Sequence, residues 1–173
     1  MPVGTELIVM GPYKLPFGHH GKGTSKRISK EHAAEFWAQE ELKDLAGKQG
    51  CYVFALQAGR GFMPWYVGKT AANFKQEVMQ AHQLEHYNDV IYKDRKGTPV
   101  LFFVTRPGTL KKIPVKQIDE LETFLIQTGR AKNPDLKNSH KTKLPDWGIK
   151  GVTRGGRGNP SSEATKFKKM MSI

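Results

Sequence analysis

The chain has 173 residues, enough for one globular domain with extensions. Its 28 Lys and Arg outnumber its 16 Asp and Glu, and the net charge of +12 favours a polyanionic partner such as nucleic acid. No apolar run reaches the length of about 18 residues that a membrane span needs, and the start of the chain does not resemble a signal peptide. A single cysteine excludes an internal disulfide framework, so we expect a cytoplasmic protein with no membrane partner.

The N-terminal part, residues 1–49, is expected to be a strand–helix extension. The sequence "ELIVM" (6–10) predicts a short strand. The loop "GHHGKGTSKR" (18–27) lacks the spacing of a phosphate-binding P-loop, because glycine follows its lysine, and we interpret it as a basic contact loop. The sequence that follows, residues 29–50, predicts a helix with Ser29 as its N-cap.

A β-hairpin is the clearest element of the middle of the chain. Two β-rich runs, Cys51–Leu56 and Phe62–Val67, flank the glycine-containing turn "QAGRG". A third apolar run, Pro99–Thr105, predicts a covered or central strand. These runs predict an α+β fold with a small, mainly antiparallel three-stranded sheet flanked by helices.

Two helices are expected around this sheet. The first follows the hairpin and has Thr70 as its candidate N-cap. Its apolar and histidine positions recur every four residues and should share one inward face: Phe74, Val78, His82 and His86. The second spans 116–129, and its expected inward side chains are Ile118, Leu121, Phe124 and Leu125.

The C-terminal part, residues 140–173, is expected to be a basic tail. Residues 139–173 carry eight basic and two acidic side chains, a net charge of +6 in a fifth of the length. Ser161 or Ser162 could cap a short helix near the end. We expect the tail to contact phosphates without sequence preference through Arg154, Arg157, Lys166, Lys168 and Lys169.

Four short sequences in the expected order carry a family resemblance. "GCY" (50–52) and "YVGKT" (66–70) lie on the two hairpin strands, "ELETFLI" (120–126) on the second helix, and "NPDLKN" (133–138) in the turn after it. Together they resemble the GIY-YIG nuclease superfamily over residues 50–139. The resemblance implies metal-dependent cleavage of nucleic-acid phosphodiesters, with DNA favoured over RNA.

The resemblance also implies roles for individual residues. Glu122 would hold one Mg²⁺ or Mn²⁺, since hard cations prefer carboxylate oxygen. Tyr52 and Tyr66 would lie beside the scissile phosphate, with Tyr52 positioning or deprotonating water. A free tyrosine is a poor base at neutral pH, so Lys69 would assist. Asn138 would support the glutamate or the phosphate.

One position departs from the family pattern. Family members carry a phosphate-binding arginine on the first helix, where this chain has Glu77, and residues 61–94 contain no arginine. Nearby substitutes are Lys75, His82 and His86. A nucleic-acid-binding module that has lost cleavage is therefore the alternative function.

The sequence "HQLEH" (82–86) allows a more remote alternative. It matches the His-x-x-Glu-His pattern of inverted zinc peptidases, in which two histidines one helical turn apart bind zinc. A peptidase needs a third ligand, and the candidate at a suitable distance, Glu163, lies in the expected tail. A five-residue match is weaker evidence than four motifs in order.

Overall fold

A computed structural model describes residues 6–23, 25–92, 96–108, 112–143, 149–152 and 158–172. The fold is α+β, as predicted. The chain divides into two compact units, residues 1–142 and 143–173, and each is described by itself. Among the described residues, no helix is long and apolar enough to cross a membrane.

The main sheet of the first unit has four antiparallel strands in the order β1–β6–β4–β5, rather than the three expected. The strands are β1 (Ile8–Lys14), β4 (Gly50–Ala58), β5 (Gly61–Thr70) and β6 (Thr98–Thr105). The fourth strand is the one predicted in the N-terminal extension. It pairs with β6, whose far edge pairs with β4, so β6 is internal as its apolar sequence predicted.

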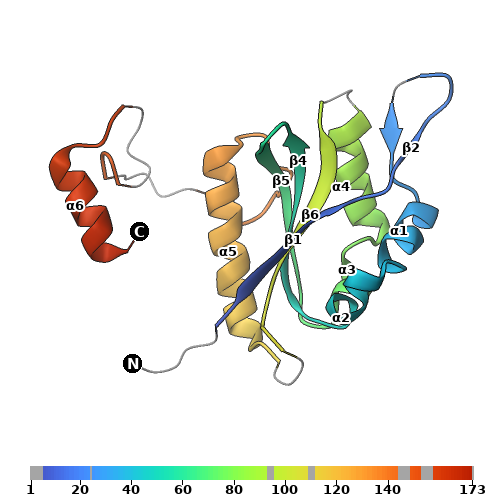
Figure 1. The fold of residues 1–173 in the computed structure, drawn as a ribbon, viewed down its shortest axis with the longest axis horizontal. Coiled ribbons are helices and arrows are strands. Elements are labelled where there is room, and N and C mark those ends of the chain that lie inside the picture. The colour runs from blue at the N-terminus through green and yellow to red at the C-terminus, as the bar shows by residue number, and fades with distance from the viewer. Residues whose placement is uncertain are drawn as a thin grey trace. The chain divides into compact units, whose positions relative to one another are not determined.

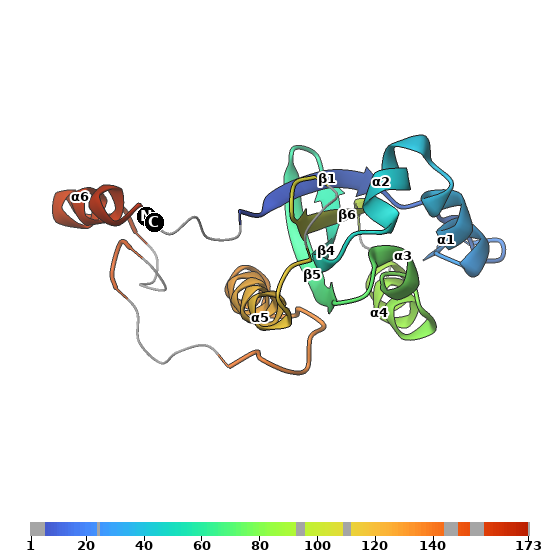
Figure 2. The same ribbon diagram turned by 90° about the horizontal axis from the view of Figure 1, so that it is seen from below.

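Helices cover both faces of this sheet, as Figures 1 and 2 show. The side chains of β4 alternate between the two faces. Tyr52 and Phe54 join the larger core, which includes Phe36 of helix α1 (Lys30–Trp37) and Tyr87 of helix α4 (Ala81–Tyr92). Cys51 packs instead with Ile118 of helix α5 (Val115–Lys132) on the other face. Both faces of β4 are therefore covered, in keeping with the apolar run Cys51–Leu56.

The segment between β1 and β4 contains a small second sheet and short helices. β2 (Gly18–His19) and β3 (Lys26–Arg27) form a two-stranded hairpin from the basic loop. The single helix expected over 29–50 is three pieces: α1 (Lys30–Trp37), a 3-10 turn η1 (Glu40–Leu42) and α2 (Lys43–Ala46). Ser29 caps α1 as predicted, accepting a hydrogen bond from the backbone N–H of His32.

The helix expected directly after the hairpin begins later and is broken. Thr70 is the last residue of β5, and Asn73 is the N-cap, so the prediction for Thr70 was wrong. The helix splits into α3 (Phe74–Glu77) and α4 (Ala81–Tyr92). Tyr87 stabilises the break, because its hydroxyl donates to the Val78 carbonyl at 2.7 Å.

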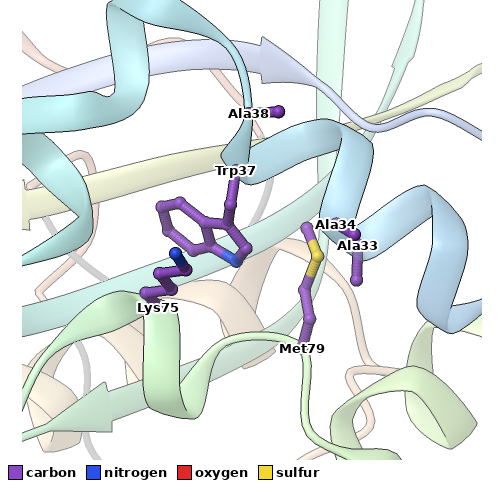
Figure 3. A pocket seen from close by; sticks show the side chains of 6 residues that line it. All are labelled: Ala33, Ala34, Trp37, Ala38, Lys75 and Met79. Atoms are coloured by element: carbon purple, nitrogen blue, oxygen red, sulfur yellow. The ribbon is translucent and has the colours of Figure 1, made fainter.

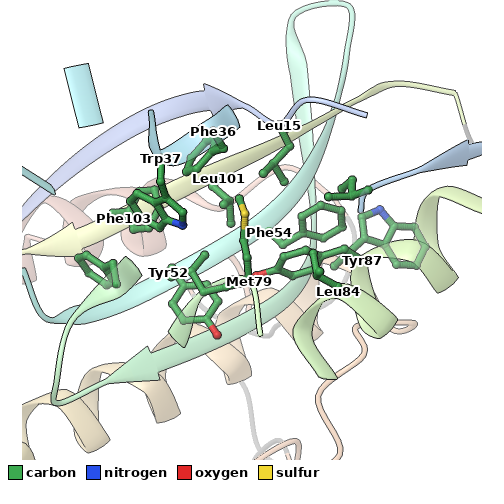
Figure 4. Packing of buried hydrophobic residues seen from close by; sticks show 14 of the residues in the cluster. Leu15, Phe36, Trp37, Tyr52, Phe54, Met79, Leu84, Tyr87, Leu101 and Phe103 are labelled. Carbon is green, nitrogen blue, oxygen red and sulfur yellow. Dashed lines mark hydrogen bonds between the residues drawn. The ribbon is translucent and has the colours of Figure 1, made fainter. Parts of the chain in front are cut away.

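The break changes which side chains of α4 face the core. Phe74 and Val78 are fully buried, as expected, but the side chain of His82 is 62% exposed and His86 is half-buried. The expectation that both histidines point inward is therefore wrong for His82. Leu84 and Tyr87 are among the side chains of α4 that are buried instead of the two histidines. Figure 4 shows them in the same core as Tyr52 and Phe54.

Helix α5 (Val115–Lys132) covers the other face of the sheet. Ile118 is buried and Leu121 and Leu125 are half-buried, as predicted. Phe124 is 63% exposed, so its predicted inward position was wrong, and Ile126 is buried instead. After α5, residues 133–138 run beside the edge strand β5.

The second unit contains α6 (Ser162–Met171). Ser161 is its N-cap, one of the two candidates, and accepts from the backbone N–H of Ala164. Three of the predicted tail contacts lie on this helix: Lys166, Lys168 and Lys169. Arg154 and Arg157 lie outside the described residues.

Candidate functional site

The two tyrosine motifs meet across the hairpin through a close approach of ring and backbone. Tyr52 pairs with Gly68 in the register of β4 and β5. A Cβ atom at Gly68 would lie 2.2 Å from Cζ and 2.3 Å from the hydroxyl oxygen of Tyr52. Tyr52 is fully buried, so its ring has no free space into which to retreat. Only glycine therefore fits beside this tyrosine.

The first glycine of the motif is constrained by its backbone. Gly50 has a φ of +143°, which L side chains rarely adopt, and its Cβ would lie 2.1 Å from the carbonyl oxygen of Val104. The glycines of both motifs thus let β4 lie close to its neighbours at the point where the tyrosines are presented.

A pocket of about 310 Å³ lies beside the edge strand β5. Four of the five predicted catalytic residues line it: Tyr66, Lys69, Glu122 and Asn138. They come from three segments that are separate in sequence, β5, α5 and the turn after α5. Tyr52 does not line this pocket. The other lining residues are Ile126, Lys137, Ser139, His140 and Lys141.

Asn138 closes the edge of β5 at the pocket. Its side-chain oxygen accepts from the backbone N–H of Val67 at 2.9 Å, and its side-chain nitrogen donates to the Val67 carbonyl at 2.7 Å. The backbone N–H and C=O of Val67 are thereby both hydrogen-bonded, as they would be by a further strand at this edge. The backbone N–H of Lys137 likewise donates to the Trp65 carbonyl at 2.8 Å. Asn138 therefore fixes the turn against the strand that carries Tyr66 and Lys69.

Glu122 is the main carboxylate in the pocket, and two lysines approach one of its oxygens. The side chain is only 14% exposed. Lys141 donates to Oε2 at 2.7 Å, and the Lys69 ammonium lies 3.0 Å from the same atom. Lys69 also contacts the carboxylate of Asp119, one helical turn before Glu122. A lysine immediately after the Tyr-Val-Gly glycine thus reaches two acids of α5.

The hydrogen bond to Asp119 raises the pKa of Lys69 above its ordinary value of 10.5, despite the opposing effect of burial. Lys69 is therefore a permanent cation near neutral pH. It can stabilise negative charge on a phosphate, but it cannot accept a proton from water or tyrosine.

The two tyrosines have different access to the pocket. Burial raises the pKa of Tyr66 above its ordinary value of 10, and the Glu77 and Glu122 carboxylates raise it further. Burial also raises the pKa of Tyr52, more strongly. Both are protonated near neutral pH, so neither is a ready base. Tyr66 lines the pocket and can orient a ligand, whereas Tyr52, 6.3 Å away between ring centroids, packs behind it.

Two polar atoms behind Tyr66 are buried without a hydrogen-bond partner among the described residues, the Tyr52 hydroxyl and Oε1 of Gln83. Gln83 donates through its amide nitrogen to Glu77 at 2.6 Å. Glu77 stands where the resemblance expects arginine, and His82 Nε2 lies 4.0 Å from it. Glu77 is therefore an acidic residue in contact with Gln83 and His82, and this position supplies no positive charge to the pocket.

The three suggested substitutes for the arginine lie away from Glu122. The ring of His86 stacks on Tyr66, with centroids 4.9 Å apart and planes 20° from parallel. Burial lowers the pKa of His86 below its ordinary value of 6.5. His82 contacts Glu77, and Lys75 lines a different pocket, next to Trp37 and Met79 (Figure 3). None of the three lines the pocket that contains Glu122.

Sequence reasoning identified Lys69 but missed three further basic residues that line this pocket. Lys137, His140 and Lys141 flank Asn138 on both sides. Their proximity to the "NPDLKN" turn was the available signal, because residues that flank a site-forming turn tend to share its location. No periodic pattern marks them, and Lys137 also contacts Asp89 of α4.

The pocket residues suit a divalent ion only in part. Among the residues that the structure describes, no three His, Cys, Asp or Glu side chains gather as a metal site. This gives the zinc interpretation of His82 and His86 no support. Mg²⁺ needs fewer protein ligands, because it keeps waters and binds through one or two carboxylates together with substrate phosphates. Glu122 fits that role once a phosphate is present, but with Oε2 held by lysines it is not a preformed metal centre.

A scan against protein-family models, a search of curated proteins and a search of solved structures each found no match to this chain. The resemblance to GIY-YIG nucleases therefore rests on the sequence motifs alone.

Proposed function

We propose that the chain cleaves nucleic-acid phosphodiesters at the pocket beside β5. The observation that carries this proposal is the convergence of Tyr66, Lys69, Glu122 and Asn138 around one pocket from three separate segments. Independent roles in packing or solvation would not require these residues to meet. The net charge of +12 supports a polyanionic substrate, and the family resemblance favours DNA.

Each of the predicted residues has a separate role in phosphodiester hydrolysis. Lys69 stabilises the negative charge that grows on the phosphate in the transition state. Tyr66, protonated at neutral pH, donates a hydrogen bond that orients the phosphate or the attacking water. Asn138 holds the turn and the strand edge in register. Tyr52 supports Tyr66 and Gly68 from the core, a positioning role rather than a proton transfer.

Glu122 would hold Mg²⁺ or Mn²⁺, with the remaining ligands supplied by water and by the substrate phosphate. A divalent ion there would stabilise charge on the phosphate and on the departing oxygen. Asp119 lies one turn away on α5 and keeps Lys69 oriented beside Glu122.

A binding module without cleavage is the second candidate. Two observations favour it: Glu77 replaces the expected arginine, and the Oε2 atom of Glu122 is held by two lysines. Such a module would keep the basic pocket and the basic helix α6 for phosphate contacts.

A cleavage panel separates the two candidates. Supercoiled plasmid, linear duplex, single-stranded DNA and RNA are incubated with the full chain and Mg²⁺ or Mn²⁺, and binding to each is measured in parallel. We expect at least one form to be cut, and Glu122→Gln to abolish cutting while binding is retained. Binding without cutting in every combination would establish the binding module instead.

A further inference from the structure

Lys141 lines the pocket, contacts the Glu122 carboxylate and has a left-handed backbone conformation. Its side chain is 34% exposed, and its ammonium lies 2.7 Å from Glu122 Oε2. Its backbone has a φ of 58°, in the left-handed region, which is unfavourable for a non-glycine residue. Such a conformation persists where the surroundings hold it, and here the side chain ends on the carboxylate of the candidate site.

Lys69 and Lys141 differ in how firmly they are held. Both ammonium groups lie within 3.0 Å of one carboxylate oxygen, so their charges repel each other. Lys69 has a second carboxylate, Asp119, and stays anchored if it leaves Glu122. Within the described part of the chain, Lys141 has one ion pair, with Glu122. Lys141 is therefore the more easily displaced of the two.

We propose that Lys141 binds the substrate phosphate in place of the expected helix arginine. Until the phosphate binds, the Lys141 ammonium stays paired with the Glu122 carboxylate. A phosphodiester in the pocket offers the ammonium an alternative anion. Transfer of Lys141 to that phosphate frees Oε2 of Glu122 for a divalent ion. Phosphate binding and metal binding then reinforce each other, and Glu122 holds metal weakly without substrate. This inference rests on the proposed use of Glu122 as a metal ligand.

The chain's other candidates fit this role less well. Lys75 lines a separate pocket, His82 pairs with Glu77, and His86 stacks on Tyr66. Lysine binds phosphate as a mobile point charge on a flexible stem, which suits exchange between two anions. An arginine fixed to a helix would bind phosphate without first occupying the carboxylate.

The test uses the full chain and two binding measurements that do not depend on cleavage. Mn²⁺ affinity is measured by electron paramagnetic resonance with no nucleic acid present. Affinity for duplex DNA is measured by fluorescence anisotropy in EDTA over a range of salt concentrations. The variants are Lys141→Met, Lys141→Arg and the control Lys143→Met, which removes one exposed charge two residues away.

We expect Lys141→Met to bind Mn²⁺ at least about fivefold more tightly than wild type, the lower end of typical coupling between sites. It should bind DNA more weakly than Lys143→Met does, with a salt slope reduced by about one. Lys141→Arg keeps the positive charge and should bind DNA as tightly as wild type does. Unchanged Mn²⁺ affinity in Lys141→Met would overturn the competition for Glu122. DNA binding equal to that of Lys143→Met would overturn the phosphate role.

These outcomes are separable from failure of the proposed function. If wild type cuts no nucleic acid, the nuclease proposal fails even when both binding shifts appear. If wild type cuts DNA but neither shift appears, the nuclease proposal stands and the role of Lys141 is refuted. Glu122→Gln provides the reference for Mn²⁺ bound elsewhere on the chain.

Discussion

Substitution of Gly68 by alanine should be strongly destabilising, although it adds a single methyl group. The new Cβ would lie 2.2 Å from Cζ of Tyr52, about 1.2 Å closer than the 3.4 Å lower limit of ordinary contact. The ring cannot move aside, because Tyr52 is fully buried within the main core. Overpacking of this kind typically costs about 1–3 kcal/mol, and we expect Gly68→Ala to fall near the upper end of that range.

The assay is chemical denaturation followed by tryptophan fluorescence, since Trp37 and Trp65 are buried in the same core. Gly47→Ala is the matched control, because nothing lies within 4 Å of a Cβ there. Its free energy of unfolding should lie within about 0.5 kcal/mol of the wild-type value, as is usual for surface substitutions. A Gly68→Ala variant as stable as Gly47→Ala would refute the close packing of Tyr52 against the second motif.

Two further substitutions test the surroundings of the pocket. Asn138→Ala removes both hydrogen bonds to Val67 and should lower the free energy of unfolding by about 1–3 kcal/mol; a denaturation midpoint equal to that of Ser139→Ala would contradict this. Burial lowers the pKa of His86 in the folded state, so the unfolded chain takes up the proton first. The stability that depends on neutral His86 is present above pH 6.5 and is lost as the pH falls. His86→Phe should therefore flatten the fall in wild-type stability below pH 6.5, and parallel curves for the two proteins would exclude this effect.

The sheet was predictable from sequence where the pattern was local. The two β-rich runs, Cys51–Leu56 and Phe62–Val67, and the glycine turn between them identified the hairpin. The apolar run ending at Thr105 identified an internal strand. The fourth strand was also readable as a strand. Its pairing with β6 was not, because the two segments are about 90 residues apart and no local pattern encodes a partner.

The helix after the hairpin shows why the site was predicted only in part. Four-residue spacing from Phe74 to His86 suggests one uninterrupted helix, but the break after α3 rotates α4 relative to that spacing. His82 consequently faces solvent and Leu84 faces the core. The break is fixed by tertiary contacts such as the hydrogen bond from Tyr87 to Val78, which the sequence pattern does not contain.

The motif residues were predictable because their types carry chemistry, whereas Lys141 was not. Glu122 and Asn138 stood out through the family resemblance, and the structure places both at one pocket. Lys141 lies in a basic tail with many lysines, and its position depends on how the chain turns after Asn138. Charge alone does not distinguish a lysine in a site from one in solvent.

The most direct test compares the cleavage rates of wild type, Glu122→Gln and Glu120→Gln on the nucleic acid that wild type cuts best. Glu120 lies on the same helix with its side chain 67% exposed, so its loss removes the same charge outside the pocket. The account predicts near-wild-type cleavage for Glu120→Gln and a loss of about 100-fold or more for Glu122→Gln, comparable to removal of one electrostatic stabiliser. Equal rates for the two variants would contradict a catalytic pocket built around Glu122.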